Sequence, residues 1–260
     1  MRRLLIEEPV SRAALWSLRV GFFAWLSVAL ALLLAWLRRL QPFEALAAVI
    51  ACEVLAVTAL LLAMIAFRAS WRSGARGMPS ALAGFMLGLA LIAYPAGMCL
   101  RDLVNPPALD LTTDPGDPPP PLQPLKQLAG GAPPPVAAST LDAGALKPIP
   151  PLLLDQSLNE ALTLALRAAG MSAWHVSTVE YAGAPLDNQA RFAATVPSFL
   201  IGWPSDAVVR LLQTEEGVRV DVRLIARQRW SLLHGGEGDI SAYLDRLETL
   251  VFGKPNYAGR

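Results

Sequence analysis

The sequence predicts a membrane protein with three N-terminal transmembrane helices followed by a small α+β domain. Three long runs almost without charge precede residue 102, fourteen of the 22 prolines lie between residues 106 and 151, and alternating apolar and polar residues follow. These shifts divide the chain into a transmembrane region at 1–102, a proline-rich connector at 103–151, an α+β domain at 152–253 and a tail at 254–260.

The composition is too apolar for an ordinary soluble domain. The chain is 54% hydrophobic and 17% charged, whereas globular chains carry roughly 25% charged residues. The lipid bilayer is therefore its first expected partner. A net charge of +1 argues against nucleic-acid binding. Cys52 and Cys99 lie in apolar runs, which argues against a disulfide-rich fold or a cysteine metal site, and no cofactor is expected.

The three predicted spans cover residues 20–37, 45–67 and 77–100. Eighteen helical residues in the first run rise about 27 Å, close to the thickness of a hydrocarbon core. A cleaved signal peptide is the alternative for this run. The run exceeds an ordinary signal core, and Arg38 and Arg39 follow it without a small-residue cleavage site.

Arginines in the short loops predict a cytoplasmic N-terminus. Three arginines lie on the opposite side, at Arg38, Arg39 and Arg101. Seven lie on the predicted cytoplasmic side: Arg2, Arg3, Arg12, Arg19, Arg68, Arg72 and Arg76. An odd number of spans then exports the C-terminal domain.

Two features inside the spans are candidates for more than lipid contact. Glu53 is a candidate intramembrane polar site, because a carboxylate at that depth is costly and often marks an ion path or a partner contact. The plainer interpretation is a neutral Glu53 bonded within the bundle, to Tyr94 or a backbone carbonyl. Gly84 and Gly88 form a small-residue motif that favours packing inside the chain over homodimerisation, and no pattern sets the oligomeric state.

The proline-rich segment reads as an extended connector, because proline lacks an amide hydrogen and fixes φ. Asp110, Asp114 and Asp117 concentrate carboxylates there. Calcium binding is one interpretation, but the spacing fits no EF-hand loop. Asp-Pro turns, in which aspartate side chains bond nearby backbone, are preferred.

The sequence pattern over residues 152–253 predicts a helix, then a four-stranded antiparallel meander, then a second helix. Ser157 and Glu160 form a capping box, and Gly170 is expected to end that helix in the left-handed conformation. Strand-like runs cover residues 174–181, 190–196, 207–212 and 218–229. Apolar residues at helical spacing between 240 and 251 predict the last helix.

The last strand alternates apolar residues with arginines and one aspartate. If helices cover only the apolar face, the other face presents an open basic surface. There Arg210, Arg223 and Arg227, beside Asp206, are candidates to bind an anionic ligand or a protein partner. The preferred structural alternative is that the arginines pair across strands of a solvated sheet with Asp206, Glu180 or Asp221.

The chain resembles a bacterial membrane-protein family called domain of unknown function 1499. The matching residues are Ser11-Arg12-x-x-x-Trp16, Trp71-Arg72-x-Gly74-x-x-Gly77, Tyr94-Pro95-Ala96, Asp110-Leu-Thr-Thr-Asp114-Pro-x-Asp117-Pro-Pro, Thr195, Gly202-Trp203, Asp206, Arg210, Val220-Asp221-x-Arg223 and Arg227. The chain departs from the family at Ser205, Leu224 and Ala226, which replace an acid and two serines. The resemblance implies an inner-membrane protein with a periplasmic domain, but no reaction.

The function expected from these features is a tethered, non-catalytic ligand-binding or interaction domain. The two histidines, His175 and His234, lie in no recognised hydrolase motif. His175 is expected at a sheet edge and His234 in a turn. A small envelope-acting hydrolase and an accessory subunit of a larger membrane complex are the alternatives, the second with a membrane-protein partner.

Overall fold

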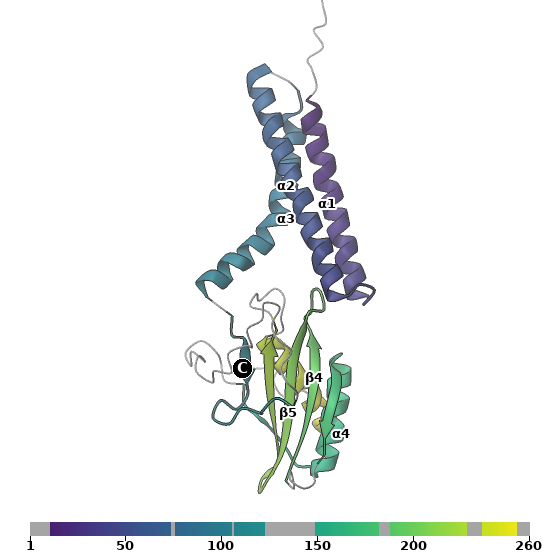
Figure 1. Cartoon of the computed structure of the whole chain (residues 1–260), viewed down its shortest axis with the longest axis vertical. Coiled ribbons are helices and arrows are strands. Elements are labelled where there is room, and N and C mark those ends of the chain that lie inside the picture. Colours follow the sequence, from purple (N-terminus) through teal and green to yellow (C-terminus); the bar gives the residue numbers. More distant parts are fainter. Residues whose placement is uncertain are drawn as a thin grey trace, which may run out of the picture. The chain divides into compact units, whose positions relative to one another are not determined.

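A computed structural model describes residues 11–73, 76–105, 107–122, 149–181, 188–227 and 236–253. The chain forms two compact units, Met1–Val104 and Asn105–Arg260. The first unit is helical and the second combines a sheet with two helices (Figure 1). Each unit is described below by itself.

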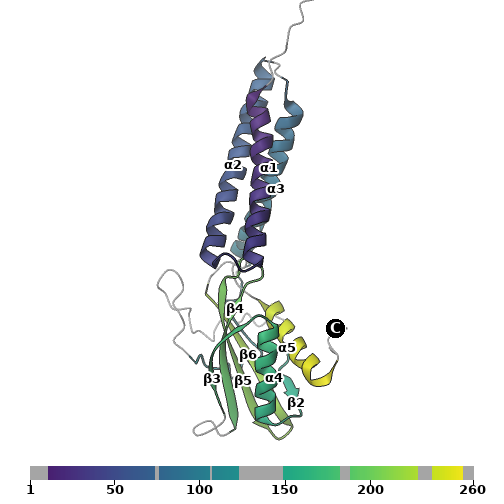
Figure 2. The ribbon, with the colours of Figure 1, turned by 90° about the vertical axis from the view of Figure 1, so that its right-hand side faces the viewer.

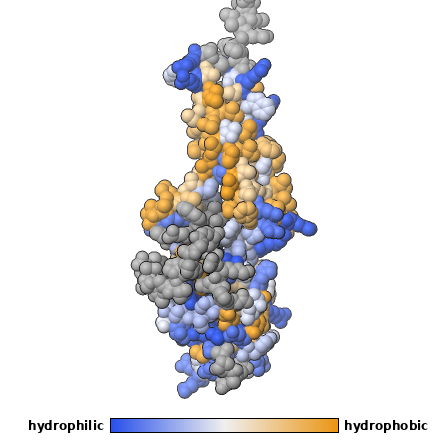
Figure 3. Space-filling model, in the orientation of Figure 1, coloured by the Kyte–Doolittle hydropathy of each residue, from blue (hydrophilic) through white to orange (hydrophobic). Residues whose placement is uncertain are grey.

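The first unit contains three helices, α1 (Arg12–Trp36), α2 (Pro42–Ser73) and α3 (Met78–Val104). All three are long and apolar enough to cross a membrane, as the sequence predicted. Apolar side chains cover much of their outer surface (Figure 3). Ser11 caps α1 by accepting a hydrogen bond from the Ala14 amide through its hydroxyl. Because this outer surface is apolar, lipid can solvate it.

Small residues line the contacts between these helices. A Cβ placed on Gly84 would lie 2.6 Å from the Ser17 carbonyl carbon in α1, and one on Gly88 would lie 2.9 Å from the Ala56 carbonyl oxygen in α2. The two glycines therefore let α3 approach both neighbouring helices. This confirms the prediction that the motif packs inside the chain.

The second unit contains a sheet of six strands, where the sequence predicted four. The predicted meander is present as β3 (His175–Glu180), β4 (Gln189–Pro197), β5 (Pro204–Thr214) and β6 (Gly217–Ala226), all paired antiparallel. Two further short strands, β1 (Asp110–Thr112) and β2 (Leu152–Leu154), both pair with the outer edge of β6. Sequence reasoning missed them because three residues in a proline-rich setting give too short a pattern to recognise.

Two helices, α4 (Leu158–Met171) and α5 (Glu237–Phe252), lie against one face of the sheet (Figure 2). The predicted capping box is confirmed, since Ser157 accepts from the Glu160 amide and Glu160 accepts from the Ser157 amide. The prediction for Gly170 is wrong. The helix continues past it to Met171, and Ala173, with φ of 56°, is the residue that adopts the left-handed conformation.

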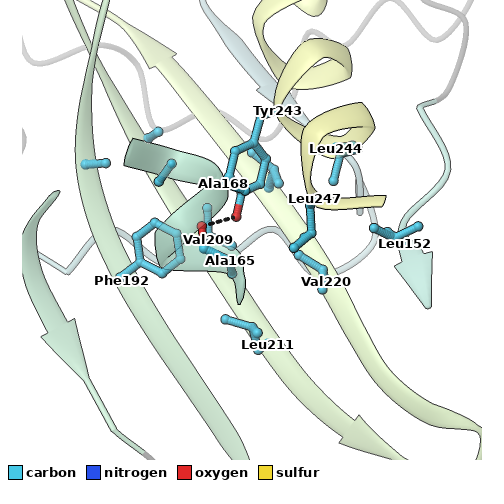
Figure 4. Close-up of a cluster of buried hydrophobic side chains, with 14 of the residues drawn as sticks. Leu152, Ala165, Ala168, Phe192, Val209, Leu211, Val220, Tyr243, Leu244 and Leu247 are labelled. Atoms are coloured by element: carbon cyan, nitrogen blue, oxygen red, sulfur yellow. Dashed lines mark hydrogen bonds between the residues drawn. The ribbon is translucent and has the colours of Figure 1, made fainter. Parts of the chain in front are cut away.

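The core of this unit lies between the two helices and the sheet (Figure 4). Tyr243 of α5 is fully buried, stacks on Trp174 with ring centroids 4.4 Å apart, and donates a hydrogen bond to the Ala165 carbonyl in α4 at 3.3 Å. Burial raises the pKa of the Tyr243 phenol above its ordinary value. The packed face leaves the other face of the sheet to carry the polar residues that the sequence singled out.

Candidate functional site

The second face of the sheet is covered by the chain's own connector. Arg210 on β5 and Arg223 on β6 are each only 5% exposed. The prediction of an open basic surface is therefore wrong for these two residues. Residues 110–119 supply the acidic and carbonyl groups that meet these arginines. We call the contact between these connector residues and the arginines of β5 and β6 the connector clasp.

Arg210 is the centre of the clasp. Its Nε and Nη2 donate to Asp221 Oδ2 at 3.2 and 2.8 Å, and its Nη1 donates to Asp117 Oδ2 at 2.7 Å. Nη2 also donates to the Asp117 carbonyl at 2.9 Å and lies 3.3 Å from Asp114 Oδ2. The guanidinium thus joins its neighbouring strand to two connector aspartates.

Asp221 is fully buried and has a second arginine partner. Arg219 donates from Nε to Asp221 Oδ1 at 2.9 Å and from Nη2 to Asp114 Oδ2 at 2.5 Å. Each oxygen of the Asp221 carboxylate therefore accepts from a guanidinium group. A buried charge that is paired and hydrogen-bonded in this way avoids the desolvation cost of an isolated one.

Arg223 holds the beginning of the connector segment. Its Nε and Nη2 donate to the two oxygens of Asp110 at 2.9 and 2.5 Å, which is the bidentate geometry that guanidinium and carboxylate groups favour. Its Nη1 donates to the Pro119 carbonyl at 3.1 Å. One side chain therefore fixes two positions of the connector, nine residues apart in the sequence.

Backbone contacts and local turns complete the clasp. The Thr113 amide donates to the Val222 carbonyl at 3.0 Å, and the Val222 amide donates to the Thr113 hydroxyl at 2.9 Å. Asp114 Oδ1 accepts from the amides of Gly116 and Asp117 at 3.2 and 3.3 Å. This confirms the predicted turn in which an aspartate bonds nearby backbone. Within the described ranges, no cluster of three potential ligands could hold a metal ion.

Arg227 and Asp206 form a separate pair at the end of the sheet. Two nitrogens of Arg227 donate to the two oxygens of Asp206, with the Nε contact at 2.9 Å. Their side chains are 18% and 22% exposed. Arg191 on β4 pairs with Glu180 on β3 at 2.8 Å. The expected cross-strand pairing of the arginines is therefore present for Arg210 with Asp221 and Arg227 with Asp206, whereas Glu180 pairs with a different arginine, Arg191.

The electrostatics of the clasp favour charged arginines. Burial alone would lower the pKa of the Arg210 guanidinium, but hydrogen bonds and the charges of Asp221 and Asp117 outweigh it and raise that pKa. The hydrogen bond to Asp110 is the largest influence on Arg223 and raises its pKa, against burial. A free anion could reach these guanidinium groups only by displacing aspartates already bonded to them.

The other predicted positions are not brought together with the clasp. Glu53 is half-buried on α2, and Tyr94, one of the two partners expected for it, is 61% exposed. His175 is exposed on β3, the edge strand, as predicted. His234 lies outside the described residues. Cys52 is buried and Cys99 exposed, and both are free thiols.

Sequence reasoning identified the arginines but missed their connector partners. From the sequence alone, Asp110, Asp114 and Asp117 are expected to form local turns, and Arg219 has no predicted role. The signal that pointed to the pairing is charge balance, because a run of connector carboxylates precedes two strands that together carry Arg210, Arg219 and Arg223. Sequence distance concealed it, since Asp110 and Arg223 lie 113 residues apart.

No family model, curated protein or solved structure matches the chain. The resemblance to domain of unknown function 1499 therefore remains a prediction.

Proposed function

We propose that the chain is a bacterial inner-membrane protein of the domain of unknown function 1499 family that presents a non-catalytic interaction domain in the periplasm. The connector clasp is the observation that carries this proposal. It makes the segment that directly follows α3 an integral part of the domain, through Asp110 on Arg223 and Asp117 on Arg210. The domain therefore includes part of the segment that the sequence predicted as an extended connector.

The clasp also favours a protein partner over a small anionic ligand. Arg210 and Arg223 each bond to carboxylates of the chain itself, and Arg227 is bonded to Asp206. Guanidinium groups that already bond to carboxylates gain little by exchanging them for another anion. The surface open to a partner includes the β3 edge, where His175, Val176 and Ser177 are exposed. An edge strand offers backbone donors and acceptors to a second chain.

The periplasmic placement rests on the arginine distribution. Helices α1, α2 and α3 are joined by short segments, and arginine bias over short loops sets orientation. The side holding Arg68, Arg72 and Arg76 is proposed as cytoplasmic. Alkaline phosphatase and a cytoplasm-only fluorescent protein, each fused after Arg260, test this placement. Phosphatase activity without fluorescence is expected, and the reverse would contradict it.

Affinity purification from native membranes tests the interaction function. The full chain is compared with a truncated chain of residues 1–104, which keeps the three helices and lacks the domain. We expect a partner at fixed stoichiometry with the full chain and its loss with the truncated chain. Equal capture by both would instead assign the interaction to the helices, as for an accessory subunit of a membrane complex.

A further inference from the structure

We propose that the turn between β4 and β5, Ser198–Trp203, inserts into the headgroup region of the bilayer that holds the chain's own helices. Phe199 at the tip of this turn is 87% exposed, and among the described residues only Trp71, at 88%, is a more exposed large apolar side chain. No charged residue occurs from Thr195 to Ser205. An exposed phenylalanine on an uncharged turn fits the boundary between headgroups and acyl chains, where interfacial proteins bury Phe and Leu side chains.

The turn is held in an ordered conformation. The Ser198 amide donates to the Trp203 carbonyl at 2.7 Å, the Gly202 amide donates to the Ser198 carbonyl at 3.0 Å, and the Trp203 amide donates to the Ser198 hydroxyl at 2.9 Å. Gly202 adopts φ of +71°, which glycine accepts without strain. Ser198 and Ile201 are buried and anchor the turn to the rest of the unit, whereas Phe199 is exposed to solvent. Little conformational entropy remains to be lost on insertion.

The pairing of the strands places this turn at the end of the sheet where the chain arrives from the membrane helices. Asp110 is opposite Ile225, Ile225 is opposite Asp206, and Asp206 is opposite Thr195. These four residues form one row across the sheet. Only Val196 and Pro197 separate that row from the turn.

The covalent connection keeps this row within reach of the bilayer. Helix α3 ends at Val104 and β1 begins at Asp110. Six residue steps span at most roughly 20 Å when fully extended. Pairing begins even earlier, since the Ala226 amide donates to the Leu109 carbonyl at 2.7 Å. The lipid around α3 is therefore the apolar phase that the turn can reach whichever side of the membrane the domain occupies.

The opposite end of the sheet has the reverse chemistry and supplies a control. There β5 and β6 are joined through Glu215 and Glu216, both exposed. A pair of carboxylates is repelled by the low dielectric of the interface and by anionic lipid. We therefore expect the turn between β4 and β5 to enter the interface and the turn with Glu215 and Glu216 to stay in water.

The test uses the full chain in vesicles of phosphatidylethanolamine and phosphatidylglycerol at three to one, with Cys52 and Cys99 replaced by alanine. A polarity-sensitive fluorophore is attached at Phe199→Cys or, as control, at Glu216→Cys. A second labelling position, Leu200→Cys, repeats the measurement, so that the conclusion does not depend on the loss of the Phe199 side chain alone. We expect blue-shifted emission at 199 and 200, quenching by lipids with a nitroxide high on the acyl chain, and at least threefold protection from aqueous iodide relative to 216.

Equal iodide quenching at 199, 200 and 216, with no quenching by nitroxide lipid, would overturn the proposal. Protection from iodide that grows with the protein-to-lipid ratio and is insensitive to nitroxide lipid would also overturn it, because a second copy of the chain would then cover the turn. Lipid quenching at a constant level across protein-to-lipid ratios would support insertion. The proposal does not depend on the proposed function, since it needs only the helices in a bilayer.

Discussion

Different kinds of internal contact stabilise the two units of this protein. The membrane unit packs through alanine, glycine and serine, with Ser17, Ala24 and Ala56 all at 0% exposure. The second unit packs large side chains such as Phe192 and Tyr243 on one face of its sheet. The other face of the sheet carries buried ion pairs, such as the pair between Arg210 and Asp221.

This difference follows from the solvent of each unit. Lipid tails are as apolar as leucine, so helices in a bilayer gain by close approach rather than by burying apolar area. Water drives the large side chains of the second unit into a core. The charges on the second face are therefore structural, because the connector that covers Arg210 and Arg223 also supplies carboxylates that pair with them.

The largest expected effect comes from removing Asp221, the buried carboxylate on β6 that holds two of the arginines on this face. Asp221→Ala leaves Arg210 and Arg219 without their shared partner, and removing one member of a buried pair costs about 3–5 kcal/mol. Pulse proteolysis of the full chain in detergent across a urea series measures this loss. As control, Glu180→Gln removes a partly exposed pair, expected to cost about 1 kcal/mol or less. Equal losses would contradict the structural role of the buried Asp221 pairs.

The next effect breaks the small-residue packing of the membrane unit. Gly84→Leu introduces a side chain against the Ser17 backbone, and overpacking typically costs about 1–3 kcal/mol. We expect a lower thermal midpoint in detergent, read by aggregation on heating. Gly97→Leu in the same helix is the matched control, because a Cβ there meets nothing within 4 Å. A midpoint that falls equally for both would mean that α3 does not pack as described.

A smaller loss of stability is expected when one hydrogen bond in the core is removed and the apolar packing is kept. Tyr243→Phe keeps the ring stacked on Trp174 but removes the donor to the Ala165 carbonyl, which is worth about 1 kcal/mol. The urea midpoint of the second unit should fall accordingly. Tyr181→Phe, on a side chain 66% exposed, should leave it unchanged. No difference between the two variants would show that the Tyr243 hydroxyl contributes nothing to stability.

The smallest effect concerns the capping box and depends on pH. Hydrogen bonds from the Ser157 side chain and amide lower the pKa of the exposed Glu160 carboxyl. A lowered folded-state pKa stabilises the fold above the unfolded pKa and loses that contribution as pH falls through the folded value. Glu160→Gln should therefore reduce stability slightly at pH 7, and the difference should vanish in acid. A difference that persists unchanged below pH 3 would contradict this account.

The sequence allowed prediction of the helices and the meander because each has a long, regular pattern. The runs at 20–37, 45–67 and 77–100, in which Glu53 is the one charged residue, predicted helices in lipid, and the alternation in β6 predicted a strand with two unlike faces. No such regular pattern predicts that the connector covers the second face of the sheet. Pairing between Asp110 and Arg223 depends on tertiary contact, and β1 is only three residues long. Ala173 took the left-handed position expected of Gly170 because the helix continued one residue beyond that glycine.

The central claim is that the connector belongs to the folded domain, and two fragments test it directly. Residues 105–260 retain β1 and the aspartates of the clasp, whereas residues 123–260 lack both. We predict cooperative urea unfolding of the longer fragment, followed by tryptophan fluorescence, and a much lower midpoint or no cooperative transition for the shorter one. Equal midpoints would contradict the claim and show that the sheet is stable without its connector.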